Sequence, residues 1–126
     1  MPVVRIGESV RRGTLIVQAD GLGADLHASV DGVIVSVTDD AVEIEADAEQ
    51  RKDLVPLPRS ESIVQAVKNA GLVGMGGAGF PTHIKLQTEL KGGTVIVNAV
   101  ECEPLLHHNI HQLEQEPELI REGLLY

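Results

Sequence analysis

Aromatic side chains are almost absent from this 126-residue sequence, which contains one Phe, one Tyr and no Trp. Proteins that bind single-stranded nucleic acid stack bases on several aromatic rings, so this class is excluded. Basic residues are also few: 10 Lys and Arg oppose 19 Asp and Glu, for a net charge of −9. Nucleic acids and anionic membrane surfaces both attract basic proteins. We therefore expect no nucleic-acid partner.

Cysteine occurs once, as Cys102, and long apolar runs are lacking. A single cysteine forms no internal disulfide, which is typical of a reducing compartment. No run approaches the roughly 20 apolar residues that span a bilayer, and the first residues lack the pattern of a signal peptide. These absences predict a cytoplasmic protein without direct membrane insertion, built as one domain or two small ones.

Glycine, in contrast, is concentrated in one short run. Four glycines lie within six residues: Gly74, Gly76, Gly77 and Gly79. Glycines allow a ligand to approach backbone N–H groups closely. Pro81-Thr82 then indicates a helix start, where unpaired N–H donors collect and phosphate binds well. Lys85 follows within one turn and adds a positive charge, so the run predicts a cradle for nucleotide or flavin phosphate.

Two known phosphate motifs can be compared with this run. Its glycines satisfy G-x-G-x-x-G, but the dinucleotide fingerprint requires a preceding strand, and residues 60–70 carry apolar side chains at helical spacing. The Walker loop requires a Lys where this chain has Phe80. A tight glycine turn that packs a helix closely therefore stays open as the alternative to a phosphate site.

Two sequence blocks together resemble a known family. Residues 74–85 are similar to the glycine-rich loop of the flavin- and NADH-binding subunit of respiratory complex I, and more similar to that of the C subunit of the Rnf electron-transport complex. Residues 98–104, Asn-Ala-Val-Glu-Cys-Glu-Pro, resemble the Asn-x-x-Glu-x-Glu-Pro segment of the same families, at a similar distance from the loop. Val100 stands where complex I sequences have Asp, which favours the Rnf side.

The first 50 residues show a second resemblance. Segments 4–13 and 27–34 are similar to the barrel-sandwich hybrid of lipoyl and biotinyl carriers, with Gly32 expected to turn the chain between strands. Short β-type runs separated by Gly and Asp support an all-β unit. These runs lie at residues 3–6, 14–18, 28–30, 33–38 and 41–45. Carriers attach their prosthetic group to a hairpin Lys, and the first Lys here is Lys52, so carrier function is not expected.

The expected fold class is α+β to α/β, in three segments. Residues 1–50 form the barrel-sandwich hybrid, residues 51–59, with charges and two prolines, form a linker, and residues 60–126 form the N-terminal portion of a flavin- and NADH-binding α/β domain. In this last segment we expect helices from Ser60 to Ala70, at 82–90, near 105–113 and from Pro117. A buried strand at 94–98 should deliver the second block to a ligand site at its carboxyl end.

The resemblance implies FMN and NADH as cofactors. FMN would lie against Gly74, Gly76, Gly77 and Gly79, with its phosphate near the loop amides and Lys85, and Phe80 would face the nucleotide. Asn98 and Glu101 would hydrogen-bond the ribityl chain or the ring edge. Glu103 would act as the catalytic residue beside the nicotinamide. The cofactor carries the redox chemistry, and the protein supplies position and electrostatics.

The 4Fe-4S clusters of this family require clustered cysteines, whereas this chain has one. We therefore expect the front part of a longer protein, with the clusters in a C-terminal region beyond it. Its partners would be other subunits of an electron-transfer complex, which could hold it at the cytoplasmic face of a membrane. The acceptor stays open among ferredoxin, a corrinoid protein and an amino-acid reductase system.

Two alternatives remain open. The chain could be a non-catalytic scaffold or interaction fragment that keeps the fold without a cofactor, so enzymatic activity of this chain by itself is undecided. His107 and His111 are four residues apart and could share a helix face, but spacing fixes no third metal ligand. No metal site is expected.

Overall fold

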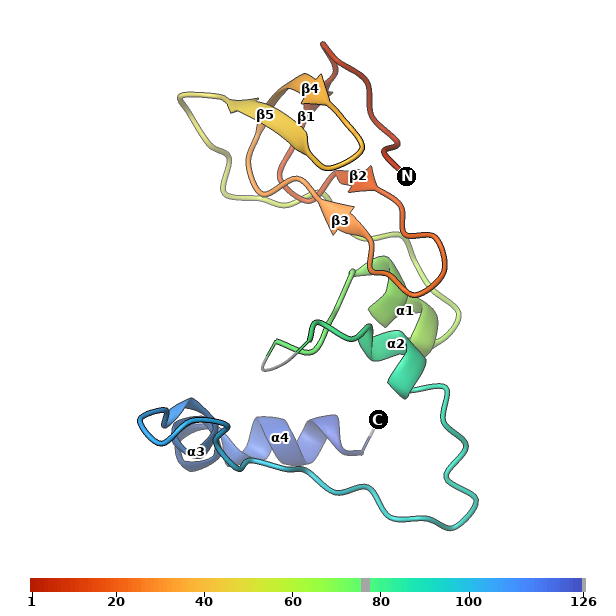
Figure 1. The fold of residues 1–126 in the computed structure, drawn as a ribbon, viewed down its shortest axis with the longest axis vertical. Coiled ribbons are helices and arrows are strands. Elements are labelled where there is room, and N and C mark those ends of the chain that lie inside the picture. Colours follow the sequence, from red (N-terminus) through yellow and green to blue (C-terminus); the bar gives the residue numbers. More distant parts are fainter. Residues whose placement is uncertain (76–77, 126) are drawn as a thin grey trace. The chain divides into compact units, whose positions relative to one another are not determined.

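The structure is a computed structural model that describes residues 1–75 and 78–125; Gly76, Gly77 and Tyr126 lie outside the described residues. The chain divides into two compact units, Met1–Thr88 and Glu89–Tyr126. Small antiparallel sheets and short helices give a mixed α+β fold (Figure 1). Among the described helices, none has the length and apolar character needed to cross a membrane.

In the described part of the first unit, five strands form two small sheets. One sheet has the order β1 (Ser9–Val10), β4 (Gly32–Val37) and β5 (Val42–Ala46), and the other pairs β2 (Leu15–Val17) with β3 (Leu26–His27); all pairs are antiparallel. A register shift between Ile34 and Ser36 keeps Ile34 opposite Ile44 and Val37 opposite Val42. The core consists of Val4, Val10, Ile16, Ala28 and Ile34.

Three of the five predicted strands are confirmed, as β2, β4 and β5, and two are wrong. Residues 3–6 form no strand and are preceded by an isolated bridge from Pro2 to Val17, while residues 28–30 follow β3. The buried residues of these runs, Val4 and Ala28, belong to the core. Their apolar character therefore reflects packing of irregular backbone and not the alternation of a paired strand.

Gly32 does not turn the chain between strands, contrary to the prediction, because it lies at the start of β4. A Cβ at this position would collide with the backbone oxygen of Glu45 and lie 2.9 Å from Cγ2 of Ile44. The close approach of the neighbouring strand, and not a turn, is therefore the reason for glycine here.

Residues 51–55 are hydrogen-bonded to the sheet unit. The Arg51 N–H donates to Oδ2 of Asp31 at 3.0 Å, and the Val55 N–H donates to the Arg12 carbonyl at 2.9 Å. The Arg11 guanidinium contacts the Asp53 carboxylate at 2.5 Å. This segment therefore lies along the sheets as a strap, although its composition is that of a linker. The division at 51–59 stays a prediction.

Helices α1 and α2 follow in the described residues of the first unit. Helix α1 (Ile63–Asn69) begins three residues after Ser60, the predicted start, because Oγ of Ser62 caps it by accepting the hydrogen bond from the Gln65 N–H at 3.2 Å. Its end at Ala70 is confirmed. Helix α2 (Thr82–Lys85) starts as predicted but stops after one turn. Leu86 and Leu90 are exposed, so no packed apolar face extends the helix to residue 90.

The second unit contains α3 (His108–Gln115) and α4 (Pro117–Gly123), which begins at the predicted proline. The predicted strand at 94–98 is wrong: these residues have no regular structure, and Ile96 is 82% exposed. A strand requires a neighbour that pairs with its N–H and C=O groups, and the described residues provide none here. The β-branched run alone is therefore insufficient.

Candidate functional site

The glycine loop is closed at its base by backbone hydrogen bonds. The Gly74 N–H donates to the Phe80 carbonyl and the Thr82 N–H to the Leu72 carbonyl, each at 3.0 Å. Val73 and Pro81 form an isolated antiparallel bridge between these bonds. These bonds hold residues 72–74 beside residues 80–82 at the base of the loop.

Lys85 lies beside this loop because α2 is a single turn. Its Nζ atom is 5.8 Å from the centroid of the Phe80 ring, within the range of a cation–π contact. A Cβ placed on Gly74 would lie 3.3 Å from the same Nζ. The structure thus brings Gly74, Phe80 and Lys85 together, as the phosphate-cradle hypothesis requires.

Gly79 contributes backbone geometry to the loop. Its φ angle is +68°, in the left-handed region that favours glycine, and a Cβ here would meet open space. The predicted ligands Gly76 and Gly77 lie outside the described residues. The described part of the predicted cradle therefore consists of a closed loop base, an exposed aromatic ring and one ammonium group.

The second block belongs to the other unit. Oδ1 of Asn98 accepts a hydrogen bond from the Val100 N–H at 2.9 Å, which forms a local turn. Glu103 is exposed, and its carbonyl accepts from the Leu106 N–H at 3.1 Å. A hollow of about 410 Å³ lies here, and its lining consists of Val100, Glu101, Cys102, Glu103, Pro104, Leu106 and His107.

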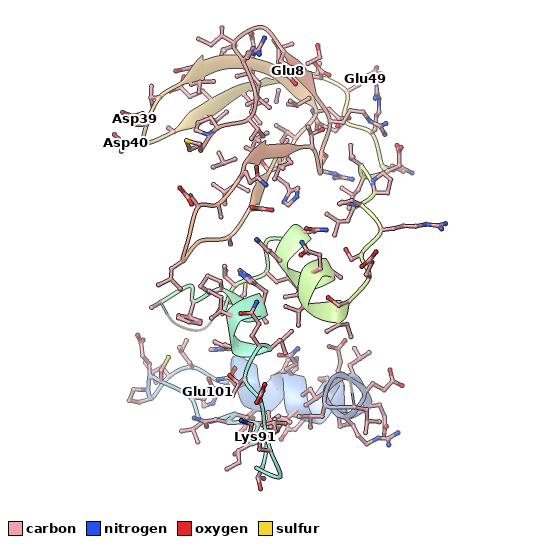
Figure 2. The ribbon with its side chains drawn as sticks, turned by 90° about the vertical axis from the view of Figure 1, so that its right-hand side faces the viewer. Glu8, Asp39, Asp40, Glu49, Lys91 and Glu101 are labelled. Carbon is pink, nitrogen blue, oxygen red and sulfur yellow. The ribbon has the colours of Figure 1, made fainter. Side chains whose placement is uncertain are left out.

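Glu101, labelled in Figure 2, is turned toward helix α3. Its Oε1 atom accepts from the backbone N–H groups of Asn109, at 2.8 Å, and Ile110, at 3.2 Å. Its Oε2 atom accepts from Nδ2 of Asn109 at 3.1 Å and lies 3.4 Å from Nδ1 of His108. The side chain is 13% exposed. Sequence reasoning missed Asn109, because nothing in an eight-residue separation predicts this pairing.

Metal ligands do not gather in the described part of the chain, where no group of three or more His, Cys, Asp or Glu side chains could hold an ion. Cys102 is a free and exposed thiol. His107 is the N-cap of α3 and His111 lies within the helix. The groups that the two candidate blocks offer to a ligand are therefore glycine backbone, one ammonium group and carboxylates.

Known proteins are similar to this chain in regions that include both the glycine loop and the second block. Residues 67–126 match the Nuo51 FMN-binding domain. The C subunit of the Na(+)-translocating ferredoxin:NAD(+) oxidoreductase complex of Acetobacterium woodii is 32% identical over 98% of this chain and 32% of its own length. The C subunit of an ion-translocating oxidoreductase complex of Pseudomonas aeruginosa is 35% identical over 83% of this chain and 16% of its own length.

A third relative matches a shorter region. The cobalamin reductase PduS of Citrobacter freundii is 42% identical over 67 residues, which are 53% of this chain and 14% of the reductase. The chain thus spans about a third or less of the length of the curated relatives that it matches.

Proposed function

Because C subunits of Rnf-type complexes are similar to most of this chain, and residues 67–126 match an FMN-binding domain, we propose that the chain belongs to their family and is part of an electron-transfer subunit. In this proposal the subunit binds FMN and NADH and passes electrons to 4Fe-4S clusters that lie outside this chain. The matched FMN-binding domain covers both the glycine loop and the second block. FMN, when bound, accepts a hydride from a nicotinamide and releases single electrons.

The observation that carries the proposal is the grouping of Gly74, Phe80 and Lys85. An ammonium group beside glycine backbone suits the phosphate of FMN, because the charge is attractive and side-chain bulk is low. The ring of Phe80, 44% exposed, can pack against the nucleotide. Gly79 and the two glycines outside the described residues, Gly76 and Gly77, complete the proposed cradle.

In the second block, Asn98 would contact the ribityl chain or the ring edge, and Glu103 would act beside the nicotinamide. The position of Glu103 supports this role, because the residue is exposed and lines the hollow of the second unit. Its carboxylate could hold the carboxamide of the nicotinamide by accepting hydrogen bonds. Glu101 was predicted to share the contact with flavin, but its carboxylate is already bonded to α3.

We assign residues 1–50 to a barrel-sandwich hybrid, residues 51–59 to a linker and residues 60–126 to the flavin domain. Two small antiparallel sheets around one core support the first assignment. Other subunits of an electron-transfer complex would be the partners, at the cytoplasmic face of a membrane. The acceptor would be ferredoxin, a corrinoid protein or an amino-acid reductase system.

Flavin binding tests the proposal in the full-length protein. Lys85→Gln removes the charge beside the glycine loop and should weaken FMN binding about tenfold or more, because a hydrogen bond to a charged group contributes about 1.5–3 kcal/mol. Flavin absorbance and fluorescence titration measure the effect. Lys68→Gln, an equal charge change at an exposed site on α1, is the control.

Two outcomes would contradict the proposal. Equal FMN affinity in Lys85→Gln and its parent would remove the phosphate site from this loop. A parent protein that takes up no flavin would instead favour the scaffold or interaction fragment.

A further inference from the structure

Glu101 holds a segment of the second unit in place through α3. Resting on the proposed function, we propose that Glu101 is a positioning residue that closes residues 102–107 onto this helix and so fixes Glu103 for the nicotinamide, and that it is not a ligand of the flavin. The inference comes from four contacts of one nearly buried carboxylate.

The contacts use both oxygens of the carboxylate. Oε1 accepts two backbone hydrogen bonds, from Asn109 and Ile110, and Oε2 accepts one from the Asn109 side chain. His108 Nδ1 lies near Oε2, at 3.4 Å. A carboxylate offers about four lone-pair sites, so three of them are occupied within this unit. Little capacity remains for a ribityl hydroxyl or a ring N–H.

Helix α3 needs such an acceptor. The first N–H groups of any helix lack partners within the helix, and a side chain at the N-cap usually supplies one. In the described part of the chain, the N-cap His107 makes no side-chain hydrogen bond and the first turn contains no acidic residue. Glu101 supplies both the acceptor and the negative charge that favours a helix N-terminus.

The same bonds close a loop of chain. Because Glu101 binds Asn109, the residues between them form a ring that includes Cys102, Glu103 and Pro104. Fixing a short loop at its ends removes many of its conformations. The turn from the Leu106 N–H to the Glu103 carbonyl restricts it further. The position of Glu103 therefore depends on the hydrogen bonds that Glu101 makes, two residues earlier in the chain.

Exchanging the carboxylate and carboxamide between positions 101 and 109 distinguishes a positioning role of Glu101 from direct contact with a ligand. Glu101→Gln removes the negative charge and leaves a neutral carboxamide oxygen, which accepts the N–H groups of α3 more weakly than a carboxylate does. Asn109→Asp places two carboxylates together, which repel. The double variant Glu101→Gln with Asn109→Asp restores one donor, one acceptor and one charge. The charge then lies in the first turn of α3, where it is favourable.

The measurements are flavin content, the KM for NADH and amide hydrogen exchange at Ile110, all in the full-length protein. Each single variant should speed exchange at Ile110 and raise the KM for NADH on the order of threefold to tenfold, the range for one lost hydrogen bond. The double variant should return both quantities to within about twofold of the parent. Glu114→Gln, an equal charge change on α3 among exposed residues, should alter neither.

Two results would overturn the positioning role. In one, Glu101→Gln loses flavin, and the double variant restores slow exchange at Ile110 but neither the KM nor the flavin content, so the charge itself is needed at position 101. In the other, Glu101→Gln speeds exchange and leaves the KM unchanged. A parent that binds neither FMN nor NADH would refute the proposed function, while exchange at Ile110 would still report separately whether Glu101 caps the helix.

Discussion

At the scale of single residues, Asp31 joins two parts of the first unit that are far apart in the sequence. Its side chain is buried, with the residue 3% exposed, and its carboxylate accepts from the Arg12 N–H at 2.6 Å and from the Arg51 N–H at 3.0 Å. These two backbone hydrogen bonds, with smaller contributions from nearby arginine charges, hold the pKa of Asp31 below its usual value. The ionised form is therefore the one that stabilises the fold.

The lowered pKa predicts a pH dependence. A carboxyl group whose pKa is lower in the folded than in the unfolded state stabilises the fold above its unfolded pKa, and this contribution is lost as pH falls through the folded pKa. Asp31→Asn should therefore lower the melting temperature at pH 7. The difference from the parent should shrink as pH falls below 3.8, the ordinary value for Asp. Thermal unfolding between about pH 7 and about pH 2.5 measures it.

Asp40 provides the matched control. It is exposed in the turn between β4 and β5, at the outer edge of the sheet (Figure 2). Asp40→Asn should leave the melting temperature nearly unchanged at pH 7. A constant difference between Asp31→Asn and its parent across the whole pH range would disprove the role of the ionised carboxylate.

At the scale of elements, the cap of α1 is open to a direct test. Ser62→Ala removes the acceptor for the Gln65 N–H and should lower the free energy of unfolding by about 1 kcal/mol, a typical cost of a lost N-cap. Urea unfolding measures the change. Ser29→Ala removes the same hydroxyl from an exposed bend of the same unit and should change stability little. An equal effect of the two substitutions would contradict the assigned cap.

Elements were predictable where their signal is local. The β-type run at residues 41–45 predicted β5, and Pro117 predicted the start of α4. Strands of two residues, such as β1 and β3, are too short for any periodic pattern. The strand predicted at residues 94–98 was wrong for a different reason, because strand formation depends on a neighbouring strand that the run itself does not encode. Local propensity therefore indicated type and approximate position, and tertiary pairing decided the rest.

The candidate site also has one part that the sequence could predict and one part that it could not. The grouping of Gly74, Phe80 and Lys85 could be predicted because a loop and one helical turn connect them over a short stretch of chain. The bond between Glu101 and Asn109 could not, because it depends on how residues 102–108 fold back. Neither residue type nor spacing distinguishes a carboxylate that caps a helix from one that binds a ligand.

At the scale of the whole molecule, we expect the strap at residues 51–55 to fold together with the two sheets. A fragment of residues 1–58 should melt cooperatively as a β-type protein and be more stable than a fragment of residues 1–50 by about 1–3 kcal/mol. The longer fragment keeps the backbone bonds of Arg51 and Val55, each worth about 0.5–1.5 kcal/mol. The exposed Arg11–Asp53 pair adds little. Circular dichroism with urea measures both fragments.

The same fragments test the absence of a prosthetic group. Lys52, the first lysine, follows the last strand and is not at a hairpin tip, so the mass of the 1–58 fragment purified from cells should equal that of the unmodified chain. A lipoyl or biotinyl adduct would contradict this expectation. Equal stability of the two fragments would show that the strap is a passive linker.

The register shift in β4 has a consequence for how this protein can change during evolution. Val35 is the additional residue between Ile34 and Ser36, and it is 43% exposed. Loss of this one codon would leave Ile34 opposite Ile44 and Val37 opposite Val42, now in an uninterrupted ladder with the same core. A single-residue deletion usually reverses every following side chain of a strand. Here it would reverse none, so this strand can differ in length between lineages while its interior stays constant.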